Sequence, residues 1–211
     1  MALRRRQKRT DQSKIDATPP WELRQRPEPA PTTGPYDLRD APADDIARVD
    51  LGALRIPASA ALELRLDLAE NHQVISANLV GPAGQMQVGL FAAPRGEGIW
   101  DSVRTEIGES LATQGAAGAS DAEGPFGTEL VGKLRVDGAL APVRFIGVEG
   151  PRWFLRAMLV GAAATDSALA EPFEDVLRGV VVVRGSDPLP VREPVPMRLP
   201  KEAIPPQPES G

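Results

Sequence analysis

Residues 143–164 read VRFIGVEGPRWFLRAMLVGAAA, in which two apolar, β-prone runs flank the tetrapeptide EGPR at 149–152. Glycine accepts a positive φ and proline fixes φ near about −65°, so a Gly-Pro pair between such runs favours a chain reversal. We therefore predict a β-hairpin with a four-residue connection at 149–152. The other elements are placed relative to this hairpin.

The second run of the hairpin, residues 153–160, is apolar on both faces. Its odd-numbered positions are all apolar, and Arg156 alone interrupts the even-numbered ones. A strand that is apolar on both faces usually has cover on both faces. We therefore place it centrally in a sheet, with a helix layer on one side and loops or further helix on the other.

Periodicity predicts the remaining elements. Apolar and polar residues alternate at 62–68, 86–90 and 130–136, and a turn leads from the first of these into residues 74–80, so all four are expected strands. Spacings of three and four predict a helix at 99–111, and a second helix is expected after a cap at Thr165 or Asp166. Val180–Val183 is short enough to be a last strand, whereas the Gly-rich residues 115–127 predict a mobile loop.

This order of elements predicts an α+β fold with a mainly antiparallel sheet of six to eight strands and two principal helices. The order resembles that of small modules typified by the photosystem oxygen-evolving-complex subunit P and the nuclear-transport factor Mog. The resemblance is one of element order, and it implies no activity.

Composition divides the chain into four parts. Residues 1–45 are basic and then proline-rich with few aliphatic side chains, so they bury too little apolar area to offset their ordering entropy and are predicted to be disordered. Residues 46–186 form the expected single α+β domain. Residues 187–201 are proline-rich and predict an extended strap, and residues 202–211 a disordered tail.

The overall composition restricts the chemistry. The 211 residues include no cysteine and one histidine, which excludes disulfides, thiolate metal sites and His-rich metal sites. No apolar run approaches the roughly 18 residues of a membrane span, and no apolar stretch follows the basic start as in a secretory signal. We expect a cytoplasmic protein without a transmembrane segment, and we predict no cofactor and no metal site.

Arg156 is the most unusual side chain of the hairpin, because a buried arginine requires a carboxylate or a bound anion. One interpretation is a structural ion pair, or an edge position where the guanidinium reaches water. The other is an anion-binding or partner-binding pocket formed with Arg144 on the neighbouring strand. No pattern predicts a catalytic residue, since GxGxxG, P-loop, GxSxG and HExxH motifs are all absent from the sequence.

The first 16 residues carry six basic and two acidic groups, whereas residues 41–186 carry 12 basic and 19 acidic groups. The basic arm is a solubilising terminus, a weak and sequence-independent contact to nucleic-acid phosphates, or a contact to anionic lipid headgroups. The acidic body would repel nucleic acid, so such binding would be salt-sensitive. The residues of this arm are Arg4, Arg5, Arg6, Lys8 and Arg9.

Several stretches together resemble a known family. They are the lead from RRRQKRT to GPYD, GALRIP at 52–57, GIWDSVRTEI at 98–107 and GPRWFLRAMLVG at 150–161. By these stretches the chain resembles a family of domain-of-unknown-function proteins from high-GC actinobacteria. The resemblance brings no known activity, and no functional residues are carried over from it.

Three functional hypotheses follow. The first is a non-enzymatic, cytosolic protein-interaction module, suggested by the long proline-rich termini and by the lack of a catalytic motif. The second is weak nucleic-acid association through the basic arm. The third is an enzyme or a small-anion binder that uses carboxylates with Arg156 or Arg144. The sequence identifies neither the protein partner nor the oligomeric state.

Overall fold

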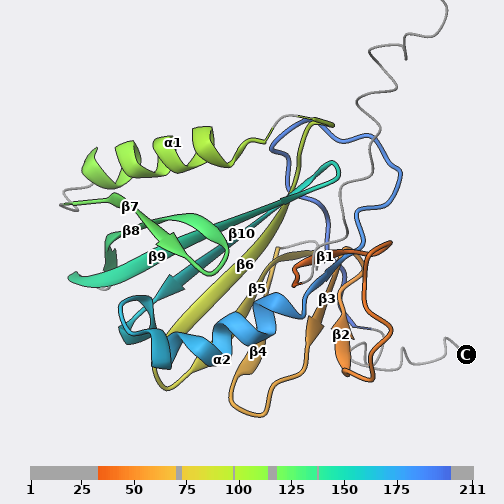
Figure 1. Ribbon diagram of the computed structural model, residues 1–211, viewed down its shortest axis with the longest axis horizontal. Coiled ribbons are helices and arrows are strands. Elements are labelled where there is room, and N and C mark those ends of the chain that lie inside the picture. Colours follow the sequence, from red (N-terminus) through yellow and green to blue (C-terminus); the bar gives the residue numbers. More distant parts are fainter. Residues whose placement is uncertain (1–32, 70–72, 97, 114–117, 137, 201–211) are drawn as a thin grey trace, which may run out of the picture. The chain divides into compact units, whose positions relative to one another are not determined.

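The computed structural model describes residues 33–69, 73–96, 98–113, 118–136 and 138–200 (Figure 1). The described residues belong to the unit Pro31–Gly211. The predicted basic arm and the predicted tail at 202–211 are not among the described residues. The elements in chain order are β1 (Tyr36–Asp37), β2 (Arg48–Asp50), β3 (Leu54–Pro57), β4 (Glu63–Leu68), β5 (Val74–Gly81), β6 (Gly84–Ala92), α1 (Trp100–Thr113), β7 (Ser120–Gly124), β8 (Gly127–Val136), β9 (Ala139–Gly150), β10 (Trp153–Val160), the 3-10 helix η2 (Ala162–Ala164), α2 (Ser167–Arg178) and β11 (Val181–Val182).

The main sheet has seven strands in the order β4-β5-β6-β10-β9-β8-β7, and every neighbouring pair is antiparallel. β10 is the middle strand, as its two apolar faces predict. The α+β class, the antiparallel sheet and the two principal helices are therefore confirmed. A second sheet, with the order β1-β11-β3-β2, was not predicted.

The hairpin between β9 and β10 is tighter than expected. Gly150 pairs with Trp153, so only Pro151 and Arg152 connect the strands, instead of four residues. Arg152 has a φ of 63°, and a turn with proline first and a positive φ second suits a two-residue connection. The predicted reversal is right, and its predicted length is wrong, because the strand pairing continues to the proline.

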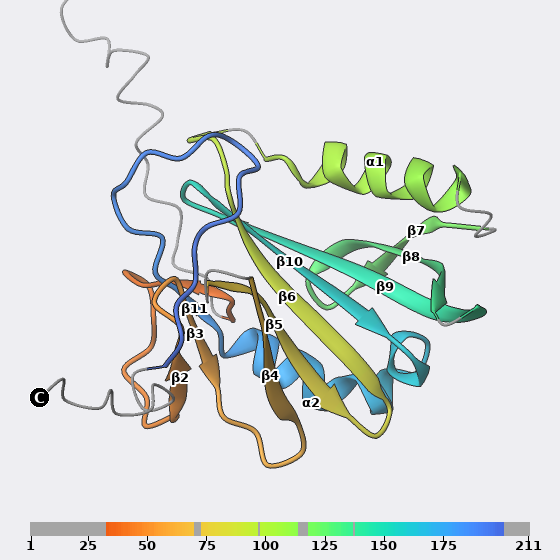
Figure 2. The same cartoon turned by 180° about the vertical axis from the view of Figure 1, so that it is seen from behind.

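The two faces of β10 pack against different helices. The odd-numbered side chains, among them Trp153 and Leu155, join the core cluster that contains Phe173 and Leu177 of α2. Phe154, on the other face, joins the cluster that contains residues of α1. In the two views the helices lie on opposite sides of the strands (Figures 1 and 2). Each side of the sheet therefore has its own core, with β10 contributing to both.

The hairpin also fixes the start of α1. The backbone N–H groups of Ile99 and Trp100 donate to the Glu149 carboxylate, the latter at 2.9 Å. The Trp100 ring lies directly on Gly147, where a Cβ atom would collide with it, and stacks on Phe154 at 5.8 Å between centroids. A carboxylate at a helix N-terminus satisfies unpaired N–H groups and opposes the positive end of the helix dipole.

Two short strands correct expectations about flexible segments. Tyr36 and Asp37, expected in the tail, pair with Val181 and Val182, and the Trp153 indole donates to Asp37 at 3.0 Å. Residues 120–124, expected in a mobile loop, form β7 and pair with β8. Both segments lack a strand-like apolar pattern, so their pairing comes from the neighbouring strand and not from their own propensity.

The C-terminal segment lies against the main sheet as an extended chain. The pairing of β5 with β6 ends at Ala77 and Val88. From there to the end of β6, residues 192–197 replace β5 as the hydrogen-bonded neighbour of β6. Val195 N–H donates to the Leu90 carbonyl at 2.9 Å, and Met197 forms a bridge with Val74. Both Val195 and Met197 are buried in the core. Among the described residues, no helix combines the length and the apolar character needed to cross a membrane.

Candidate functional site

The two arginines singled out in the sequence lie on opposite faces of the main sheet. Arg144 is the cross-strand neighbour of Leu159, whereas Arg156 is the neighbour of Gly147. Cross-strand neighbours share a face, and side chains alternate along each strand, so Arg144 lies on the α2 side and Arg156 on the α1 side. The pocket in which both arginines take part is therefore not formed.

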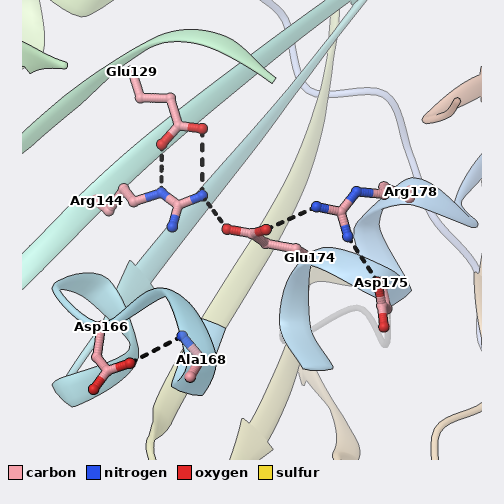
Figure 3. Close-up of polar contacts among 7 residues, drawn as sticks. All are labelled: Glu129, Arg144, Asp166, Ala168, Glu174, Asp175 and Arg178. Carbon is pink, nitrogen blue, oxygen red and sulfur yellow. Dashed lines mark hydrogen bonds and ion pairs between the residues drawn. The ribbon is translucent and has the colours of Figure 1, made fainter. Parts of the chain in front are cut away.

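Arg144 is committed to a chain of ion pairs between the sheet and α2 (Figure 3). Its guanidinium bonds to Glu129 of β8 and donates to Glu174 of α2 at 2.6 Å. Glu174 in turn accepts from Arg178 at 2.9 Å, and Arg178 donates to Asp175 at 2.7 Å. Two carboxylates thus occupy the guanidinium of Arg144, which makes it a structural link and not a free anion-binding group.

Burial sets the electrostatics of this ion-pair chain. Arg144, Glu129 and Glu174 are all buried. Burial raises the pKa of the Glu129 carboxyl, although Arg144 opposes that rise. Burial disfavours the charged form of Arg144, but the hydrogen bonds to Glu174 and Glu129 outweigh it and raise the pKa of the guanidinium. The ion pairs are therefore interdependent, because each buried charge relies on its neighbour.

Arg156 has a different environment. Its guanidinium lies 5.1 Å from the centre of the Phe91 ring. Its cross-strand neighbours are Gly89 and Gly147, which carry no side chain. Across the part of the chain that the structure describes, it has no hydrogen-bond or ion-pair partner, and burial lowers its pKa. The structural ion pair that the sequence suggested is thus not formed with any described residue.

Five polar side chains lie on the same side of the sheet as Arg156, on β4, β5 and β6. We call them the polar strip: Asp67, Ser76, Asn78, Gln85 and Gln87. Ser76 and Asn78 donate to the Asp67 carboxylate at 2.5 and 2.7 Å. Gln85 donates to Asn78 at 2.9 Å, and Gln87 to Ser76 at 3.2 Å. The hydrogen bonds from Ser76 and Asn78 lower the pKa of Asp67, so its carboxyl is ionised at neutral pH.

This side of the sheet is covered by a helix only in part. α1 contacts β8 and β9, and Figure 2 looks onto the other strands, where β4, β5, β6 and β10 are seen without a helix in front of them. We call the polar strip together with Phe91, Arg156, Met158 and Val160 the open face. Most of its β6 and β10 members are half-buried, and Gln85 is exposed. Ser76 and Asn78 are buried, so the accessible polar groups of the open face are those of Asp67, Gln85, Gln87 and Arg156.

The polar strip was missed at the level of sequence. Its signal is the spacing of Ser76 with Asn78 and of Gln85 with Gln87, which puts each pair on one face of its strand. The register between the strands was needed to place these pairs beside Asp67 and Arg156. Glu129 was missed for the same reason, because nothing local to it indicates that it faces Arg144.

The structure also contains an open groove of about 470 Å³ between α2 and the segment that leads from β3 to β4. It is lined by small or apolar residues of 57–61 and by Pro172 and Val176, with Glu171 and Asp175 at its acidic side. Neither Arg144 nor Arg156 lines it. Within the described ranges, no three His, Asp or Glu side chains are grouped so that they could hold a metal ion.

Comparison with solved structures found three matching chains, two of which are described below. A crystal structure from Bacteroides thetaiotaomicron matches with a TM-score of 0.41 and 14% identity, covering 67% of this chain and 49% of that one. The present chain therefore spans about half of that protein. The solution structure of PsbP (CyanoP) from Synechocystis matches with a TM-score of 0.38 and 11% identity, covering 68% of this chain and 97% of that one. At these scores the similarities carry no argument about function.

A search of curated proteins found no match to the chain. A family model described as "Protein of unknown function (DUF3710)" matches residues 34–205. The match begins two residues before β1 and extends past the C-terminal segment that packs on β6. It therefore includes both sheets and both helices, and it bears out the resemblance to a domain of unknown function. The actinobacterial source stays a prediction. The chain belongs to the DUF3710 family.

Proposed function

We propose that the protein is a non-enzymatic, cytoplasmic protein-interaction module, and that its open face binds a partner that places a carboxylate against Arg156. The observation that carries the proposal is the unpartnered guanidinium of Arg156, which is half-buried in the middle strand of the sheet. A guanidinium that is partly withdrawn from water loses part of its hydration, and pairing with a carboxylate compensates that loss. A carboxylate can accept two parallel N–H bonds from it and restore that loss.

The surroundings of Arg156 support a protein partner. Met158 and Val160 follow it on β10 and are half-buried, so they offer apolar area beside the charge. Within the polar strip, the exposed Gln85 and the half-buried Gln87 contribute accessible amide groups, whereas Asn78 is buried and bonded to Asp67 and Gln85. Peptide groups and apolar side chains match such a mixed surface. Asp67, ionised at the other side of the strip, favours a donor group of the partner there.

Affinity purification of the full-length chain tests the proposal. The variant Arg156→Met removes the guanidinium and keeps a long side chain, and Arg135→Met serves as the control, since Arg135 is exposed on β8. We expect a protein that co-purifies with the wild type and with R135M but not with R156M. Melting temperatures should agree within about 3 °C, because replacing an unpaired, half-buried charge by an apolar group of similar length costs little.

A further variant addresses the carboxylate. Arg156→Lys keeps the positive charge but cannot form two parallel bonds, so partner binding should be weakened without being abolished. Retention of the same partner by R156M at wild-type level would refute the role of Arg156. Binding of small carboxylates, measured calorimetrically, together with no co-purifying protein would indicate a small-anion site in place of a protein-interaction site.

A further inference from the structure

The outer strand β4 has a self-complementary sequence. Residues 62–66 read Leu-Glu-Leu-Arg-Leu, so opposite charges stand at equal distances on either side of Leu64. β4 is the end strand of the main sheet among the described residues, and its one neighbour is β5. The outer edge of such a strand presents backbone N–H and C=O groups that can pair with another strand.

The side chains of β4 are accessible for such pairing. Glu63 and Arg65 are 63% and 60% exposed and form an ion pair of 2.8 Å within the strand. Leu64 and Leu66 lie on the opposite face and are half-buried against the core. Leu68, at the end of the strand, is 47% exposed. A second strand added to this edge would therefore meet leucines on one face and charges on the other.

We propose that two copies of this chain associate through β4, with the two strands antiparallel about a two-fold axis at Leu64. In this register Leu64 stands opposite its copy, and Glu63 of each chain stands opposite Arg65 of the other. Directly opposite charges stabilise an antiparallel pair, and the two-fold axis makes the contact twice. The leucine face would continue across the junction, and the sheets of the two copies would join edge to edge.

The alternative arrangements are less favourable. An antiparallel register about Leu66 would place Arg65 opposite Asp67, but Asp67 already accepts from Ser76 and Asn78. The register with β5 also shifts between Asp67 and Leu68, which disturbs the ladder at that end. A parallel arrangement in register would set Glu63 beside Glu63, which is repulsive. The segment around Leu64, where β4 pairs with β5 without a register shift, is therefore the segment expected to pair with the second copy.

The contact is small. β4 has six residues, and pairing of two such strands buries less than the roughly 1,200–2,000 Å² of a typical stable interface. The dimer is consequently weak, and its population rises with protein concentration. This association does not depend on partner binding at Arg156, since that residue lies three strands away on β10.

Sedimentation velocity of the full-length chain, over a series from about 1 to 500 µM, tests the proposal. The wild type should shift from monomer towards dimer as the concentration rises. Arg65→Glu should raise the dimer Kd by about tenfold or more, because two attractive pairs become repulsive. The double variant Glu63→Arg with Arg65→Glu should restore the dimer, since the charges are complementary again.

Arg135→Glu is the matched control, because it changes the net charge equally at an exposed position on β8. Thermal melting checks that every variant folds. A wild type that is monomeric over the whole range would overturn the proposal, as would a dimer that R65E leaves unchanged. Loss of the dimer in R65E without restoration in the double variant would overturn the register about Leu64.

Discussion

At the scale of single residues, the two arginines of the β9–β10 hairpin differ in where their compensating charge comes from. Arg144 lies between Glu129 of β8 and Glu174 of α2, so its charge is neutralised by two other elements of the fold. Arg156 has the Phe91 ring and two glycines as neighbours, and burial lowers its pKa. Side chains alternate between the two faces of a strand, so the position of each arginine along its strand decides which face it occupies. On one face the arginine is a structural ion-pair residue, and on the other it is a candidate binding residue.

Replacing Arg144 by methionine should destabilise the protein by about 3–5 kcal/mol at pH 7, because Glu129 and Glu174 would remain buried without their cation. Burial already raises the pKa of Glu129, and the loss of Arg144 would raise it further. A carboxyl whose folded pKa is raised favours the folded state at low pH and disfavours it as pH rises through that pKa. The loss of stability of R144M relative to the wild type should therefore become smaller as the pH falls.

Denaturant unfolding of the wild type, R144M and the control R135M, at pH 7 and again at about pH 5, measures this effect. The control lies at an exposed position and should change stability by less than about 0.5 kcal/mol. A deficit of R144M that is equal at the two pH values would contradict the role assigned to the buried carboxylates.

At the scale of elements, one strand end and one glycine hold α1 in place. Glu149, near the end of β9, accepts from the first N–H groups of the helix, and Gly147 leaves room for the Trp100 ring. The same ring donates to the Thr128 carbonyl at 2.7 Å, which ties the helix to β8. α1 therefore depends on the hairpin for its position, although its own periodicity is enough to make it helical.

The variant Gly147→Ala tests this dependence. The added methyl group would collide with the Trp100 ring, so we expect a loss of about 1–3 kcal/mol and a weaker near-UV signal from Trp100. Gly108→Ala is the matched control, because Gly108 lies within α1 and a Cβ atom there meets nothing within 4 Å. That variant should be more stable than the wild type by about 0.4–1 kcal/mol. Equal effects of both substitutions would contradict the proposed packing.

At the scale of the folded unit, the two sheets, α2 and the C-terminal segment share one core. Leu54 and Ile56 of the small sheet belong to the same cluster as Trp153 and Leu159 of the main sheet. Met197, more than a hundred residues after Val74, is buried beside it. Arg192 additionally bonds to Glu106 of α1 at 2.8 Å. The C-terminal segment is therefore part of the folded unit and not an appendage.

Met197→Ala should lower the free energy of unfolding by about 2–5 kcal/mol, because it opens a cavity where the segment meets the core. Val191→Ala is the control, since Val191 is exposed in the same segment. Its effect should stay within about 0.5 kcal/mol. Chemical unfolding of both variants provides the comparison, and a Met197→Ala variant as stable as the wild type would show that the segment is not needed for the core.

Much of the architecture could be predicted where a segment carries its own pattern. The two apolar faces of residues 153–160 place β10 in the middle of the sheet, and the spacings of Trp100, Val103 and Ile107 indicate α1. The capping role of Asp166, which accepts from Ala168 N–H at 2.9 Å, is also visible in the sequence as one of two alternatives. These features depend on neighbours within a few residues, so local periodicity and capping chemistry are sufficient to find them.

The rest depends on contacts between distant segments. β1 and β7 are short and polar, and they are strands because β11 and β8 offer them backbone partners. The polar strip needs the register of three strands, and the pairing of Arg144 with Glu129 and Glu174 needs the register together with the position of α2. Strand register and the packing of helices on a sheet are long-range properties that no local pattern encodes. Composition and periodicity therefore define the class of the fold, whereas tertiary packing decides which charge is neutralised and which remains available on the open face.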